Sequence, residues 1–210
     1  MTEQLQQRDL VVLVADKQME FSVRGLLERR RALRIQPISF EIFAHPAKDP
    51  GCRRKSHDFL RPFHRQYRFA LVMFDREGCG SEGQTREELE AEIEQRLAQS
   101  GWENRAASVV LDPELEIWVW SDSPEVDRAL DWSGRQPNLR SWLKTEGFVT
   151  EEGAKPEQPK EAMQRALKIA RRPRSASIYR DLASKISVDR CTDAAFIKFK
   201  ETLQRWFGES

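Results

Sequence analysis

The chain has 210 residues, 39% of them hydrophobic and 33% charged, so it can bury a core under a heavily charged surface. Its 35 basic and 34 acidic residues leave a formal net charge of +1, which excludes a general attraction to nucleic acid and leaves only local basic patches. No apolar run approaches the roughly 20 residues that cross a bilayer, and the polar N-terminal segment lacks a signal-peptide pattern, so we expect no membrane partner.

The cysteines are odd in number and scattered. Cys52, Cys79 and Cys191 show no spacing typical of metal ligands. This usage predicts reduced thiols in a cytoplasmic protein.

Four short segments have the character of strands. Residues 10–15 and 69–74 are apolar throughout, which is typical of strands buried on both faces of a parallel sheet. Residues 37–43 alternate apolar and polar side chains and predict a half-buried strand near an edge. The fourth predicted strand covers residues 107–111.

Helical patterns separate these strands. They cover residues 17–31 and 56–66, with a loop expected over 45–55, and a third helix begins at Thr85, where Glu88 completes a capping box. The alternation of strands and helices, with right-handed crossovers, predicts an α/β fold: a mainly parallel, Rossmann-like sheet flanked by helices.

The second half of the chain has a different character. Residues 123–159 predict a connecting segment, and the stretch 151–159 contains two prolines, a glycine and no large apolar residue, as in a linker. Residues 160–210 predict a C-terminal helical extension packed on the core. We therefore divide the chain into an α/β core over 1–122, the connecting segment over 123–159 and this extension.

Carboxylates gather where the predicted strands end. Asp16 follows the first strand, the pair Asp75 and Glu77 follows the third, and Glu116 comes after the fourth, while Glu20 lies one helical turn beyond Asp16. The carboxyl ends of parallel strands meet at one edge of a sheet, where ligands bind, and carboxylate oxygens are preferred ligands of Mg²⁺. These residues predict a Mg²⁺ or Mn²⁺ site; the alternative is that each is a helix cap or a solvated charge.

A glycine loop follows the third strand. Residues 78–83, GCGSEG, match the pattern G-x-G-x-x-G of dinucleotide-binding proteins. However, Glu82, Glu87, Glu88 and Glu90 crowd the start of the next helix and would repel a pyrophosphate. A nucleotide-sensing module is therefore the least favoured function, and turn glycines are the alternative.

Three short motifs resemble a known family. They are DKQME at residues 16–20, DRE at 75–77 and ELEIW at 114–118, joined by a tail with PKE at 159–161 and with Cys191 and Phe196. This layout resembles the TOPRIM fold, and more closely a TOPRIM-like bacterial family of unassigned function associated with phage-defence loci, whose motifs look like Glu-Gly-x-Thr-Glu, Asp-x-Asp and Glu-Leu-Glu-Ala-Trp.

The chain departs from that family at three positions. Asp16 stands in place of a glutamate and reaches one methylene less far, whereas Glu77 stands in place of an aspartate and reaches further. Lys17 replaces a glycine beside the expected metal. Its ammonium can occupy the place of the cation or bind the scissile phosphate.

The resemblance implies a metal-dependent, phosphodiester-cleaving component of a bacterial phage-defence system. In this interpretation Asp75 and Glu77 hold the metal, and Asp16 is a third ligand or the general base. Glu20 and Glu116 support them or bind a second metal. The expected catalytic residues are thus Asp16, Glu20, Asp75 and Glu77, and the expected metal ligands are Asp16, Asp75, Glu77 and Glu116.

Nucleic acid and other defence-system proteins are the expected partners. Arg53, Arg54 and Lys55, together with Lys17, are candidate phosphate contacts, although solvated helix ends explain such patches equally well. The alternative function is a non-catalytic interaction subunit of a larger defence complex. The near-zero net charge and Lys17 favour this alternative, whereas the retained acids favour the enzyme.

Overall fold

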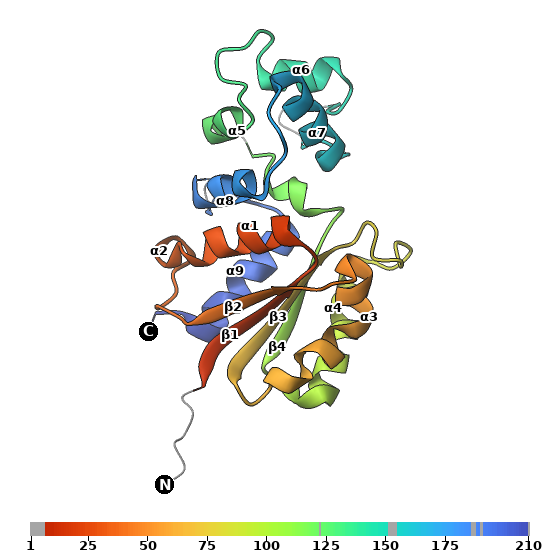
Figure 1. Ribbon diagram of the computed structural model, residues 1–210, viewed down its shortest axis with the longest axis vertical. Coiled ribbons are helices and arrows are strands. Elements are labelled where there is room, and N and C mark those ends of the chain that lie inside the picture. The colour runs from red at the N-terminus through yellow and green to blue at the C-terminus, as the bar shows by residue number, and fades with distance from the viewer. Residues whose placement is uncertain (1–6, 122, 151–154, 186–187, 190, 210) are drawn as a thin grey trace.

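A parallel sheet forms the centre of the protein (Figure 1). The computed structural model describes residues 7–121, 123–150, 155–185, 188–189 and 191–209. Within these residues the sheet has four strands, all parallel, in the order β2-β1-β3-β4. Their bounds are Arg8–Val14 for β1, Phe40–Ala44 for β2, Tyr67–Asp75 for β3 and Ala106–Leu111 for β4. The predicted α/β fold is confirmed.

The strand patterns place β1 and β3 in the middle of the sheet. Residues 10–14 of β1 and 70–74 of β3 are fully buried, as expected for strands covered on both faces. In β2, Ile42 is buried while its neighbours are half-buried or exposed. The alternating segment is therefore an edge strand, as its sequence predicts.

Helices cover both faces of the sheet (Figure 1). The helix α1 (Lys17–Leu27) and the C-terminal helix α9 (Ala194–Phe207) lie on one face, and α3 (Lys48–Leu60) and α4 (Arg86–Leu97) lie on the other. The chain steps from β1 outward to β2, and then returns across β1 to β3 and β4. The strand order therefore reverses between β1 and β3, and in open α/β sheets ligands bind beyond the carboxyl ends of strands at such a point.

The helix α3 corrects the prediction of a loop over residues 45–55. It begins at Lys48, so Pro50 falls in the first turn, where a backbone N–H has no helical partner to lose. At Gly51 a side chain would place its Cβ only 2.0 Å from Nδ1 of His45. The basic residues Arg53, Arg54 and Lys55 consequently lie on a helix.

The remaining helices of the described residues vary in length. They are α2 (Arg30–Leu33), the 3₁₀ helices η1 (Arg61–Phe63) and η3 (Leu115–Trp118), the π-helix η2 (Ala98–Trp102), α5 (Pro124–Ala129), α6 (Leu139–Thr145), α7 (Pro159–Ala170) and α8 (Ala176–Lys185). Gly101, with φ of 95°, ends the helical run of α4. Residues 151–154 of the predicted linker, and residue 186 in the predicted C-terminal helical extension, lie outside the described residues.

The helices α5 to α8 lie beyond the carboxyl ends of the strands (Figure 1). Among them α8 packs against α1, where a Cβ added at Gly25 would stand 3.0 Å from the carbonyl oxygen of Arg180. The glycine thus allows the two helices to approach closely. None of the described helices is long and apolar enough to traverse a bilayer.

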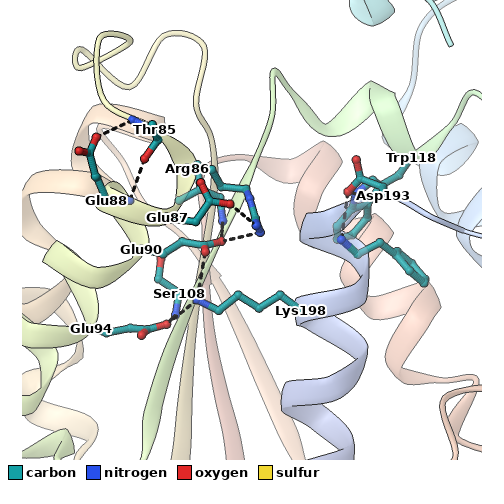
Figure 2. Close-up of polar contacts among 12 residues, drawn as sticks. Thr85, Arg86, Glu87, Glu88, Glu90, Glu94, Ser108, Trp118, Asp193 and Lys198 are labelled. Atoms are coloured by element: carbon teal, nitrogen blue, oxygen red, sulfur yellow. Dashed lines mark hydrogen bonds and ion pairs between the residues drawn. The ribbon is translucent and has the colours of Figure 1, made fainter.

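The outer edge of β4 is closed by side chains (Figure 2). Glu94 and Glu90, both on α4, accept hydrogen bonds from the backbone N–H groups of Ser108 at 2.9 Å and Val110 at 3.0 Å. Lys198 on α9 pairs with Glu90 at 3.1 Å and with Glu94 at 2.8 Å. The carboxylates therefore occupy donors that an edge strand otherwise offers to another chain.

We expect Lys198→Met to lower the free energy of unfolding by roughly 1.5–3 kcal/mol at neutral pH, because it removes the nearer of the two cations paired with the buried Glu90 and leaves only Arg86, at 3.4 Å. Burial raises the pKa of Glu90 and the Lys198 ammonium lowers it, so the variant's Glu90 has a still higher pKa. A protonated Glu90 needs no cation. The difference in free energy of unfolding between the wild type and the variant should therefore shrink as the pH falls from about 7 to about 4.5. Urea unfolding measures it.

Lys200→Met is the matched control on the same helix, because Lys200 pairs with the well-exposed Asp189. Lys200→Met should lower the free energy of unfolding by less than about 1 kcal/mol. If both variants lowered it equally and at every pH, the β4 edge would not depend on Lys198.

Candidate metal centre

Three carboxylates converge at the carboxyl edge of the sheet. They belong to Asp75, the last residue of β3, and to Glu114 and Glu116, which follow β4. One carboxylate oxygen from each lies within 4.8 Å of the others. Glu114 is 4% exposed and Glu116 only 2% exposed. Such a concentration of negative charge away from water requires compensation by protons, by cations or by hydrogen-bond donors.

The strand register brings these residues together. Asp75 is paired with Leu111 across the β3–β4 ladder, so the turn that follows β4 passes directly beside it. The backbone N–H of Leu115 donates to Oδ1 of Asp75 at 2.9 Å, and the N–H of Glu77 donates to the carbonyl of Pro113 at 3.0 Å. The ELEIW motif is thereby fixed to the end of β3.

The C-terminal part of the chain supplies cations to the two glutamates. At the start of α7, the Lys160 backbone N–H donates to Glu114 at 2.8 Å and its ammonium lies 3.3 Å from the same carboxylate. Arg174 and the hydroxyl of Tyr179 both donate to Oε1 of Glu116, at 2.7 Å and 2.5 Å. Burial opposes the charge of Lys160, but the attraction of Glu114 and Glu116 raises its pKa nonetheless.

Among the described residues, Asp75 has no comparable cation. Burial raises its pKa well above the usual range, and the negative charges of Asp49 and Glu116 raise it further, while Lys160 acts in the opposite direction. Asp49 lies in the first turn of α3, where its carboxylate accepts the backbone N–H of Asp75 at 2.9 Å. Burial also raises the pKa of Asp49, and Asp16 contributes to both shifts. The ends of β1, β2 and β3 thus share one electrostatic environment.

The predicted site residues separate into two groups. Asp75 and Glu116 belong to the converging cluster, and Asp16 is close enough to influence it. Asp16 also caps α1, because its Oδ1 accepts the N–H of Met19 at 2.9 Å. Glu77 is exposed and is not part of the described cluster, and Glu20 pairs with Arg24 at 3.1 Å.

Three residues of the site were given no role in the prediction from the sequence. Asp49 stands in a segment that its two prolines and glycine mark as a loop, although an acid in the first turn after a strand is a usable signal. Glu114 is part of the ELEIW motif but is not a predicted ligand. Lys160, likewise, is part of the PKE tail without an assigned role.

Of the candidate phosphate contacts, two lie beside the glycine loop and two lie elsewhere. Arg53 donates to the carbonyl of Gly80 at 3.3 Å and to Gln84 at 3.4 Å, so it faces the glycine loop. Arg54 approaches the same loop. Lys55 instead pairs with Asp58 on the surface of α3, and Lys17 is exposed at the start of α1.

Comparison with known proteins identifies no relative of this chain. No protein-family model matches the chain, and none of the curated proteins or solved structures searched gives a match. The resemblance to TOPRIM domains therefore stays a prediction from the sequence motifs.

We expect Asp75→Asn to leave the metal-free protein as stable as the wild type or more stable. The amide keeps the acceptor for the Leu115 N–H, and it removes a charge that burial, Asp49 and Glu116 all disfavour. Thermal melts in EDTA measure this difference.

Asp9→Asn, at the opposite end of β1, is the contrasting variant. Its carboxylate accepts from the backbone and hydroxyl of Ser39 and pairs with Arg68 at 3.0 Å, and these contacts lower its pKa despite burial. This change should cost about 1 kcal/mol. If Asp75→Asn lowered the stability of the metal-free protein as much as Asp9→Asn does, Asp75 would be a structural residue.

Proposed function

We propose that this protein is a divalent-metal-dependent, phosphodiester-cleaving component of a bacterial phage-defence system. The observation that carries the proposal is the convergence of Asp75, Glu114 and Glu116 at the edge where the strand order reverses. The three motifs that resemble the TOPRIM-like family fall at or beside this edge, which supports the same interpretation.

The donor set fits Mg²⁺ or Mn²⁺. In the described chain, Oδ2 of Asp75 and Oε2 of Glu116 have no hydrogen-bond partner, so each carboxylate has an oxygen to offer. Hard, charged oxygens are what these ions take, and the low exposure of the glutamates strengthens the attraction. Asp75 and Glu116 would hold the ion, with Glu114 as the third ligand once Lys160 releases an oxygen.

A bound divalent ion would supply Lewis acidity toward a phosphoryl oxygen and would lower the pKa of a bound water. The chain itself supplies the remaining groups. Asp16, across the reversal point from Asp75, would accept a proton from water. Arg53 and Arg54 stand beside the loop that leaves the site, and Lys17 stands next to Asp16, so all three can hold the phosphates of a strand.

A second candidate function is a non-catalytic interaction subunit of a larger defence complex. Lys160 and Arg174 favour it, because they already place two positive charges against Glu114 and Glu116. In that case the ammonium of Lys160, rather than the Lys17 ammonium considered from the sequence, replaces a metal. The acids would then have only a structural role, tying the C-terminal helices to the core.

The metal site predicts a ligand-dependent rise in melting temperature. At a Mn²⁺ concentration of 100 times the dissociation constant the wild type should gain about 2.7 kcal/mol, because the ion binds only the folded state. Asp75→Asn should lose this gain and also lose cleavage of plasmid DNA or RNA.

Glu77→Gln is the matched control, since Glu77 is exposed and lies outside the cluster. It should keep the stabilisation by Mn²⁺. If Glu77→Gln abolished the response as fully as Asp75→Asn, the ligand set predicted from the sequence, with Asp75 and Glu77 as a pair, would replace the one proposed from the structure.

Lys160→Met separates the two functions. If the acids form a metal site, the wild type responds to Mn²⁺ and the variant responds at a lower Mn²⁺ concentration, because the competing ammonium is gone. If the protein is an interaction subunit, the wild type ignores millimolar Mn²⁺, and only the variant acquires a response.

A further inference from the structure

The glycine loop after β3 already holds an anion of its own. Oε1 of Glu82 accepts hydrogen bonds from the backbone N–H groups of Gly78 at 3.1 Å and Gly80 at 3.2 Å. Both glycines have positive φ, 81° and 78°, a conformation that turns nearby N–H groups toward one point. These donors, with the N–H of Glu82 itself, hold the pKa of the carboxyl below its usual value. The loop is thus an anion-binding nest occupied by an exposed side chain.

The nest carries more positive charge than Glu82 balances. Arg53 donates to the carbonyl of Gly80, and its charge acts on Glu82. Nη2 of Arg54 lies 2.9 Å from the point that a Cβ of Gly80 would occupy. Within the described chain, the exposed Arg54 has no ion pair or hydrogen bond. Arg76, by contrast, is already paired with Asp112 at 2.8 Å.

We propose that this loop is a phosphate-binding site, in which Glu82 stands in for a backbone phosphate of a nucleic-acid strand and is displaced when the strand binds. The inference rests on the proposed function for the identity of the ligand. The loop begins three residues after Asp75, so a phosphate held there lies beside the candidate metal centre.

The surroundings favour a single diester phosphate over a dinucleotide. Both glycine N–H groups meet one oxygen of Glu82, which is the footprint of a single phosphate oxygen. The first turn of the next helix, α4, contains Glu87 and Glu88, and their negative charge disfavours a pyrophosphate at its N-terminus. Arg54 is free to contact a second oxygen of the same phosphate.

The test is strand binding without metal. A fluorescently labelled single-stranded DNA, and an RNA of the same sequence, are titrated in EDTA at low salt and followed by anisotropy. Glu82→Gln should bind the strand about fivefold tighter or more, because the competing charge is gone while the amide oxygen still supports the loop. Arg54→Ala should bind several-fold more weakly, with a salt dependence shallower by about one charge.

Two further variants make the result specific. Glu103→Gln removes one exposed carboxylate at the opposite, amino-terminal end of β4, and should change the affinity less than about twofold. Gly80→Ala, combined with Glu82→Gln, should erase the gain, because a Cβ is strained at φ of 78° and meets Arg54. Thermal melts confirm that each variant is folded.

If Glu82→Gln bound the strand no more tightly than Glu103→Gln, the proposal would be overturned. Glu82 would then only stabilise the conformation of its own loop. Failure of both the wild type and Glu82→Gln to bind either strand would overturn it as well. Because EDTA removes divalent ions, this outcome is independent of the metal centre. A protein that ignores Mn²⁺ but shows the Glu82→Gln gain would keep the phosphate site and lose the proposed hydrolysis.

Discussion

The structure depends on keeping three carboxylates together in a poorly solvated place. Asp75, Glu114 and Glu116 repel one another, and burial strengthens that repulsion. Lys160 and Arg174, from the C-terminal half of the chain, compensate this charge by pairing with Glu114 and Glu116. Both cations join the segment that carries α7 and α8 to the carboxyl ends of the strands, and in Figure 1 the helices α5 to α8 lie beyond those ends.

Carboxylates elsewhere in the chain show what a purely structural role looks like. Glu90 and Glu94 accept backbone N–H groups from β4 and share the ammonium of Lys198, so their charges are compensated (Figure 2). Asp75 differs, because within the described residues no cation contacts it directly and its Oδ2 has no hydrogen-bond donor, while burial raises its pKa. The difference separates a candidate metal ligand, Asp75, from a structural acid.

The sequence predicts those parts of the fold that depend on local pattern. The apolar segments of β1 and β3, the alternation of β2 and the capping box at Thr85 each describe their own surroundings. Asp75 and Glu116 were predictable because the ends of parallel strands must meet. The position of Asp49 was not, because Pro50 and Gly51 resemble a loop until the first turn of α3 is seen. The contact of Lys160 with Glu114 was not predictable from the sequence either, because tertiary packing brings together residues 46 positions apart.

The most direct test of the central claim is the position of a bound ion. Crystals of the full chain grown with Mn²⁺ and measured near the manganese absorption edge give an anomalous difference map that locates the metal without reference to activity. We expect a peak within coordination distance of Asp75 and Glu116, with Lys160 displaced from Glu114. An empty map at this edge of the sheet, with the Lys160 ammonium still on Glu114 at millimolar Mn²⁺, would contradict it.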